Sequence, residues 1–233
     1  MSAAFEAARD PARAAARSAY LHGQFPFLGL SHPERVAIER RLLLAHPAPT
    51  GAQGLRALVL RSWELPEREY QYFGIAVLRR HLAALTPAQL PTLRHLITTK
   101  SWWDTVDDLA THVVGDVARR HPGLRSTMDD WIASENIWLA RTALLHQERW
   151  GDRTNADLLF AYSLRRAADR EFFIRKAIGW ALRSYAKTRP EEVEAFLRRH
   201  GDALSSLSKR EALRGVAMGR GSRAGGRRRA AGG

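Results

Sequence analysis

One stretch near the middle of the chain decides the predicted fold: residues 101–123, which read SWWDTVDDLATHVVGDVARRHPG. Apolar side chains recur within it at the three- and four-residue spacing of a helix, at Val106, Leu109, Val113 and Val117. Ser101, followed three residues later by Asp104, resembles an N-cap, and His121-Pro122-Gly123 ends the pattern. We therefore predict a helix over about residues 102–120.

Similar helical units lie on both sides of this stretch. Ser134 and Asp169 each precede a further apolar pattern with helical spacing, and such spacing continues from residue 11 to about residue 216. No segment shows a convincing strand alternation. The pattern therefore predicts an all-α protein.

Large aromatic residues mark an internal repeat, because Trp103, Trp138 and Phe173 follow one another at intervals of 35 residues. Each interval holds two predicted helices. Helix pairs at this period are typical of α-solenoids, whose stacked repeats make a concave surface. We predict such a solenoid; the alternative is a nonrepetitive helical bundle whose aromatic residues are spaced by coincidence.

The composition points to a polyanionic partner. The chain of 233 residues has 37 Lys and Arg against 24 Asp and Glu, a net charge of +13, and is 45% hydrophobic. Such an excess favours phosphate backbones or anionic membranes, and we expect the concave surface to be a basic groove. The absence of cysteine excludes disulfides and thiolate chemistry. No secretory signal or membrane-spanning run is evident, so we expect a cytoplasmic protein.

The chain is expected to divide into a folded repeat domain, residues 1–217, and a basic tail, residues 218–233. The tail has five Arg, no acid and almost nothing to bury, which predicts disorder. It either adds nonspecific phosphate contacts or is merely solvated.

Trp103 and Asp107 are the first candidates for a functional site. They are four residues apart in the predicted helix, so an indole face and a carboxylate border one place, where a cation can be held. Arg141 follows Val106 by one 35-residue interval, so stacking of the repeats is expected to bring its guanidinium beside Asp107. It would keep that carboxylate ionised or grip a phosphate. The alternative is a core-edge tryptophan with a structural Arg–Asp bridge.

Residues 171–183, EFFIRKAIGWALR, interleave aromatic and basic side chains in a way that suits nucleic-acid contact. Two consecutive phenylalanines cannot both point into a core, so at least one is expected to be partly exposed. Trp180 is expected to face the same groove, although ordinary core positions remain the alternative for both Phe173 and Trp180. The predicted DNA contacts here are Phe172, Arg175, Lys176 and Arg183.

Residues 208–211, SKRE, form a capping-box pattern that starts a helix with two adjacent cations, Lys209 and Arg210. Free N–H groups at a helix start bind phosphates, so both are candidate DNA contacts; a plain cap is the alternative. The nine histidines show no metal-ligand spacing, and no phosphate loop, dinucleotide fingerprint or serine-hydrolase motif is present. Any catalysis is therefore expected to use a carboxylate, with no metal and no cofactor.

Several long motifs resemble the DNA alkylation repair family, the AlkD-like DNA glycosylases. They are residues 100–107 (KSWWDTVD), 131–134 (WIAS), 136–139 (NIWL), 171–183 and 207–212 (LSKREA). The resemblance also takes in Phe27-Leu28-Gly29 and the segment Leu65-Pro66-Glu67-Arg68-Glu69. It implies HEAT-like repeats and an enzyme that removes N3- and N7-alkylated purines from duplex DNA and leaves the lesion stacked. We expect the protein to be a monomer.

By position, the resemblance implies that Asp107 is the catalytic carboxylate, Trp103 and Trp180 the active-site tryptophans, Arg141 the groove arginine and Tyr20 a backbone contact. Lys100, at the start of the first motif, is also predicted to contact DNA. Ala140, before Arg141, and the Arg-rich tail depart from the family pattern. Two other functions stay open: a noncatalytic scaffold that binds DNA or a protein, and a basic membrane-surface protein, for which no amphipathic anchor is seen.

Overall fold

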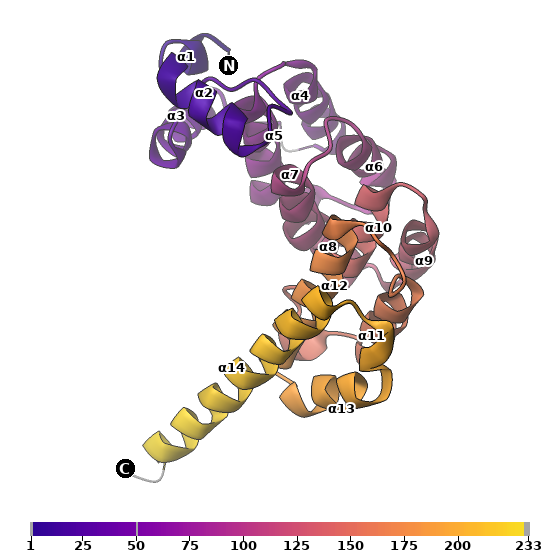
Figure 1. The fold of residues 1–233 in the computed structure, drawn as a ribbon. Coiled ribbons are helices and arrows are strands. Elements are labelled where there is room, and N and C mark those ends of the chain that lie inside the picture. The colour runs from indigo at the N-terminus through magenta and orange to yellow at the C-terminus, as the bar shows by residue number, and fades with distance from the viewer. Residues whose placement is uncertain (1, 50, 231–233) are drawn as a thin grey trace. The chain divides into compact units, whose positions relative to one another are not determined.

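A computed structural model describes residues 2–49 and 51–230, and all regular structure within these ranges is helical (Figure 1). The predicted all-α class is confirmed, and the succession of helices is that of an α-solenoid. The predicted basic groove stays a prediction. Contacts within the chain divide it into two compact units, residues 1–100 and 101–233. Within the described ranges, no helix has the length and apolar character to cross a membrane.

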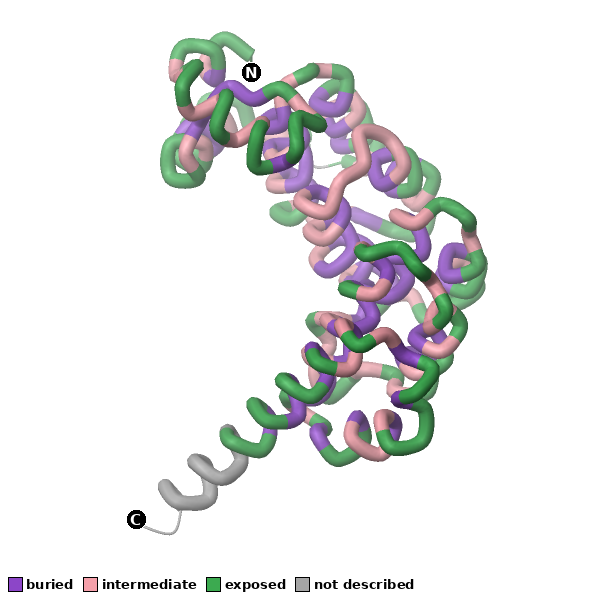
Figure 2. Tube along the Cα trace, in the orientation of Figure 1, coloured by how far each residue is buried: buried purple, intermediate pink, exposed green. Residues whose placement is uncertain are grey.

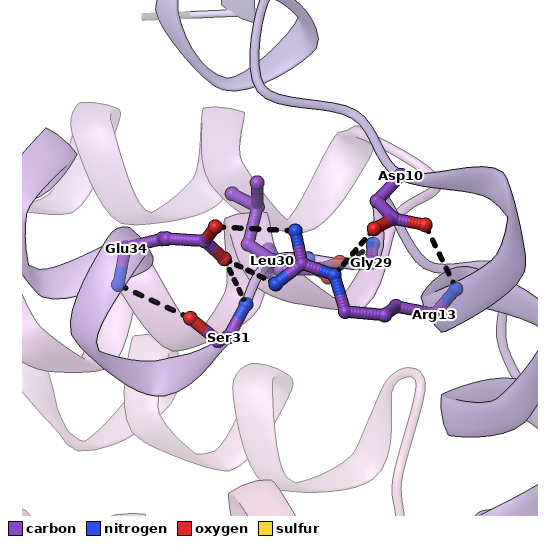
Figure 3. Close-up of polar contacts among 7 residues, drawn as sticks. Asp10, Arg13, Gly29, Leu30, Ser31 and Glu34 are labelled. Atoms are coloured by element: carbon purple, nitrogen blue, oxygen red, sulfur yellow. Dashed lines mark hydrogen bonds and ion pairs between the residues drawn. The ribbon is translucent and has the colours of Figure 1, made fainter.

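The first unit begins with helices whose ends are capped by side chains. Asp10 caps α2 by accepting from the Arg13 N–H, and Ser31 caps α3 in a capping box with Glu34 (Figure 3). The unit consists of α1 (Ser2–Glu6), α2 (Pro11–Tyr20), α3 (His32–Ala45), α4 (Ala52–Glu64), α5 (Arg68–Arg80), two 3-10 turns (Leu82–Ala84 and Pro87–Gln89) and α6 (Leu90–Thr98).

Arg13 links the two caps, because its guanidinium bonds both Asp10 and Glu34 (Figure 3). Gly29 lies between them with φ of 89°, and a Cβ there would be 2.1 Å from the Asp10 carbonyl oxygen. Only glycine fits this backbone and this close approach.

The family-like motif at residues 65–69 has a structural role in this unit. Glu69 is completely buried, and its carboxylate accepts from the backbone N–H groups of Leu28, Gly29 and Leu30. Arg68, also completely buried, donates through Nη1 to the Lys100 carbonyl at 2.7 Å. Two buried charges thus fix the loop before α3 and the end of the unit.

The second unit begins with the helix predicted over residues 102–120. It runs unbroken through α7 (Trp103–Asp108), the π-helical segment η3 (Leu109–Val114) and α8 (Gly115–Arg120), which confirms the prediction. The remaining elements are the 3-10 turn Pro122–Leu124, α9 (Arg125–Ala133), α10 (Ile137–Leu145), the turn Gly151–Arg153, α11 (Ala156–Arg165), α12 (Phe172–Ala186), α13 (Pro190–His200), the turn Gly201–Ala203 and α14 (Ser206–Ala230).

The predicted caps are wrong in position. Trp102, not Ser101, precedes α7 and makes no side-chain cap. Asn136 rather than Ser134 caps α10, by accepting from the N–H groups of Trp138 and Leu139. At the last helix, Ser205 accepts from the Ser208 N–H at 3.1 Å, so Ser208 lies inside the first turn instead of capping it. The polar side chains upstream organise the loops instead of the helix ends, as Asp169 does by accepting from the Glu171 N–H.

Glycines let the helices of the second unit approach closely. A Cβ at Gly115 would be 2.3 Å from the His146 carbonyl oxygen, and Trp150 donates through Nε1 to the Gly115 carbonyl at 3.1 Å. Cβ atoms at Gly179 of α12 and at Gly215 of α14 would meet the opposite helix at 2.8 and 2.5 Å. Each close approach brings polar groups of neighbouring helices within bonding distance.

The last helix, α14, extends past residue 217, the predicted end of the repeat domain. Buried and exposed residues alternate along α14 as far as residue 221 (Figure 2), and Gly219 is still buried. Arg220 pairs with Glu194 of α13 at 2.6 Å. The backbone is helical through Ala230. The division into a repeat domain ending at residue 217 and a tail starting at residue 218 stays a prediction, and the last three residues of that tail, 231–233, lie outside the described residues.

Candidate functional site

A cavity of about 410 Å³ lies wholly within the second unit. Its walls come from α7, α10 and α12, and it is lined by Trp103, Asp107, Arg141, Phe172, Phe173, Lys176, Trp180 and Arg183. The cavity therefore collects the three residues predicted to be catalytic and four of the predicted DNA contacts in one place.

Asp107 and Arg141 form a two-pronged ion pair at this cavity. Arg141 donates through Nε to Oδ1 and through Nη2 to Oδ2 of Asp107, both at 2.7 Å. The third nitrogen, Nη1, donates to the Phe173 carbonyl. The contact predicted from the 35-residue interval is confirmed, and it ties α7, α10 and the start of α12 together.

The two partners of this pair differ in exposure. The Arg141 side chain is 3% exposed, whereas that of Asp107 is 16% exposed. Three of the guanidinium nitrogens are already engaged within the protein. This arrangement favours Arg141 as the residue that orients Asp107 over the alternative in which it grips a phosphate, because a phosphate would have to displace these bonds.

Burial raises the pKa of Asp107 above the ordinary aspartate value, while the hydrogen bonds and charge of Arg141 act in the opposite direction. The neighbouring acids Asp104 and Asp108 add to the rise. The carboxylate is thus a partly desolvated anion with a fixed orientation, and such an anion stabilises a nearby positive charge more strongly than one in water.

The aromatic residues separate into a packed cluster and the cavity walls. Trp102 contacts Trp138 and Phe173, with ring centroids 5.8 and 5.1 Å apart, and Trp138 contacts Phe173 at 5.0 Å. In this cluster the residue that packs with Trp138 and Phe173 is therefore Trp102, the neighbour of Trp103. Trp103 is instead available to the cavity, together with Trp180.

Phe172 is 57% exposed and Phe173 is half-buried, which confirms that one of the two faces outward. Both line the cavity, so Phe173 belongs to the aromatic cluster and to the site at once. Trp180 is half-buried on the next turns of the same helix. Aromatic faces of this kind favour contact with a cationic or sugar group.

The predicted cations fall into two groups. Lys176, which is exposed, and Arg183 line the cavity. Arg175 does not, and its Nε donates to the Asp169 carbonyl at 2.9 Å. Lys209 and Arg210 lie in the first turns of α14, outside the residues that line the cavity.

Tyr20 and Lys100 belong to the first unit. Tyr20 is 71% exposed. Lys100 donates through Nζ to the Leu65 carbonyl at 2.6 Å, and burial is the main cause that lowers its pKa. Their contacts with DNA stay predictions.

One residue at the site was not predicted to act there. Glu211, taken from the sequence as part of a capping box, is buried and accepts from Arg183. The only sequence signal for this is its place in the family-like motif 207–212, since pairing across two helices leaves no local pattern. Within the described ranges, no three His, Asp or Glu side chains come together as a metal site requires.

The fold and the site together define a class of protein. It is an all-helical repeat protein in which a paired carboxylate and two tryptophans line one cavity. Residues 1–216 match the family model described as "DNA alkylation repair enzyme". The chain belongs to this family.

Two solved structures are similar to the chain. One is described as a predicted DNA alkylation repair enzyme from Enterococcus faecalis; it has 33% identity and a TM-score of 0.80, over 88% of this chain and 94% of that one. The other, smu.31 from Streptococcus mutans UA159, has 16% identity and a TM-score of 0.55, over 78% and 89% of the two chains, and supports the fold alone. No curated protein matches the sequence.

Proposed function

We propose that this protein is a DNA glycosylase that hydrolyses the N-glycosidic bond of cationic N3- or N7-alkylated purines in duplex DNA. Its family supports a role in the repair of alkylated DNA. The observation that carries the finer proposal is the Asp107 carboxylate, held by two bonds from Arg141 at a cavity that Trp103 and Trp180 line.

The proposed reaction uses the charge of the lesion. Alkylation at N3 or N7 makes the purine cationic, so the C1′–N bond breaks with its electron pair moving to the base, which leaves as a neutral molecule. The sugar gains positive charge at C1′ as the bond breaks. Water then bonds to C1′ and loses one proton, which gives an abasic site. The base leaves without a strong general acid because it is already cationic.

Asp107 is proposed to act on the sugar. An anion that is already oriented stabilises positive charge that develops at C1′. The same carboxylate positions the water and accepts its proton. Trp103 and Trp180 offer electron-rich faces to the sugar. In this proposal the side chains address the sugar and the backbone, and the alkylated base stays in the stack.

The basic side chains at the cavity are proposed to bind the phosphates beside the lesion. Lys176 and Arg183 line the same cavity as Asp107, and phosphate contacts set the position of a protein on DNA. We further propose that the protein acts as a monomer on DNA in the cytoplasm.

Release of the base tests the proposal directly. The purified protein is incubated with methylated duplex DNA, with and without a chelator, and free 7-methylguanine and 3-methyladenine are quantified against spontaneous loss. We expect release by the wild-type protein in both conditions and a large loss in Asp107→Asn and Trp103→Ala. Asp152→Asn is a matched control, because Asp152 is 69% exposed and outside the cavity lining.

Wild-type rates in both site variants would refute the proposed chemistry. Tight binding to the alkylated duplex with no base released on long incubation would instead establish the noncatalytic scaffold. Binding to anionic vesicles stronger than binding to DNA would support the membrane-surface alternative.

A further inference from the structure

We propose that Glu211 is a positioning residue, which holds the Arg183 guanidinium at the cavity so that it binds a DNA backbone phosphate in a fixed orientation. This proposal rests on the proposed function. Glu211 is an acid beside a surface that is proposed to bind DNA, which is an anion. Simple charge repulsion predicts that removal of Glu211 strengthens DNA binding, whereas positioning of Arg183 predicts that it weakens the phosphate contact.

The carboxylate of Glu211 lies between two arginines. Arg183 of α12 donates through Nη1 to Oε2 at 2.5 Å, and Arg214 of α14 donates through Nη1 to Oε1 at 2.9 Å. The Glu211 side chain is 5% exposed, whereas those of Arg183 and Arg214 are 31% and 58% exposed. Of these two arginines, only Arg183 lines the cavity.

The backbone of α14 also holds Arg183. A Cβ at Gly215 would be 2.5 Å from the Arg183 carbonyl oxygen, so this turn of α14 lies directly against the arginine main chain. A Cβ at Gly179 would be 2.8 Å from the Glu211 Cβ, so glutamate is seated on the turn that precedes Trp180. Main chain and guanidinium of Arg183 are therefore both fixed by one helix.

The position of Arg183 on its own helix explains why its orientation matters. Lys176, Trp180 and Arg183 are spaced by four and three residues, so they share one face of α12, and all three line the cavity. A guanidinium has five N–H donors, and a single nitrogen of Arg183 bonds Glu211. The remaining donors suit a phosphate, and a held side chain binds it with less loss of rotamer freedom.

These contacts give α14 an indirect role at the site. No described residue of α14 lines the cavity, but the helix supports α12, which does. Ser208 donates to the Arg175 carbonyl at 2.8 Å, five residues before Trp180 on α12. Ser208 and Glu211 are the first and last residues of the sequence SKRE, the motif from which a phosphate-binding helix start was predicted. In the structure both residues form hydrogen bonds with α12. Lys209 and Arg210, between them, are not needed for this role.

The test compares Glu211→Gln, Arg183→Gln and the double variant in single-turnover release of 7-methylguanine from a methylated duplex, at several protein concentrations. Plain electrostatics predicts that loss of an acid strengthens DNA binding. Positioning predicts that Glu211→Gln lowers catalytic efficiency about tenfold, and that the double variant equals Arg183→Gln. Glu194→Gln is the charge-matched control, because it removes an acid that pairs with Arg220 away from the cavity.

Tighter DNA binding with wild-type release in Glu211→Gln, or additive losses in the double variant, would overturn the proposal. Thermal unfolding identifies a variant that fails to fold. If Glu211→Gln fails to fold, Arg183→Lys provides the test, because lysine keeps the positive charge but lacks the several donors of a guanidinium. Wild-type catalytic efficiency in Arg183→Lys would also overturn the proposal.

The binding measurement separates this inference from the proposed function. If the wild-type protein releases no base, the proposed function fails, but the salt dependence of binding to the duplex still tests Glu211. Loss of the Arg183 contact reduces the slope of log K against log salt by about 0.9. The same reduction in Glu211→Gln supports positioning, and an unchanged slope refutes it.

Discussion

Replacement of Arg141 by methionine would remove the guanidinium that orients Asp107 and leave a side chain of similar length without donors. Asp107 would lose two hydrogen bonds of 2.7 Å and remain in a site where burial already raises its pKa. An adjacent arginine lowers an aspartate pKa by about 1–3 units. In the variant that opposing effect is gone, so the pKa of Asp107 rises further.

The sign of the effect on catalysis follows from the form of Asp107 that acts. The carboxylate must be ionised to stabilise positive charge on the sugar, and a group with a raised pKa stays protonated to a higher pH. The acidic limb of base release therefore moves toward alkaline pH in Arg141→Met. Activity recovers as the pH is raised through this new limb.

The position of this acidic limb is measured from the rate of single-turnover release of 7-methylguanine between about pH 5 and 9, corrected for spontaneous depurination. Arg198→Gln is the matched control, because it removes an arginine that is 67% exposed and pairs with Glu194. Loss of one partner of a buried ion pair costs about 3–5 kcal/mol of stability, so chemical denaturation must show that the variant is folded at every pH used.

An acidic limb at the wild-type pH, in a folded Arg141→Met protein, would refute the reasoning. It would show that the guanidinium does not stabilise the ionised carboxylate. A rate that falls equally at every pH would assign Arg141 to geometry alone.

Three further predictions concern stability and DNA binding. Gly29→Ala should lower the free energy of unfolding by more than about 2 kcal/mol, because its Cβ would meet the Asp10 carbonyl at 2.1 Å, whereas Gly23→Ala, with positive φ but open space, should cost less in the same denaturant titration. Burial lowers the pKa of His146 to about 4, so between pH 6.5 and 4 the unfolded chain binds a proton that the folded chain does not. Stability should fall by about 3 kcal/mol over that range, and the fall should be smaller in His146→Leu. Lys176→Gln should reduce the salt slope of duplex binding by about 0.9; an unchanged slope would remove this lysine from the phosphate contacts.

The helices could be predicted from the sequence because apolar spacing reports the face that each helix buries. Helix starts could not, because a serine or aspartate serves a loop as readily as a helix end. Ser134 shows this: its hydroxyl accepts from the Asn136 N–H, and Asn136 then caps α10. The division into two units depends on contacts between distant residues, and local spacing does not contain them.

The two halves of the site differ in the same way. The Asp107–Arg141 pair was predictable because both residues occupy related positions in neighbouring repeats. The Arg183–Glu211 pair depends on how closely α12 and α14 approach at Gly179 and Gly215. The sequence alone does not indicate which segment packs against a glycine. The resemblance to a family placed Trp103 and Trp180 together. The packing of Trp102 against Trp138 and Phe173 separates it from its neighbour Trp103, although both tryptophans are half-buried.

The helix from Trp103 to Arg120 contains one wider turn, which the sequence pattern did not indicate. Residues Leu109–Val114 are π-helical, and a π turn contains an additional residue relative to an α turn. Upstream of it, Asp107 must face Arg141; downstream, Gly115 must face the His146 carbonyl. In a regular α-helix, one residue more or less rotates a side chain by about 100°, so the wider turn changes which residue of the downstream segment faces the His146 carbonyl.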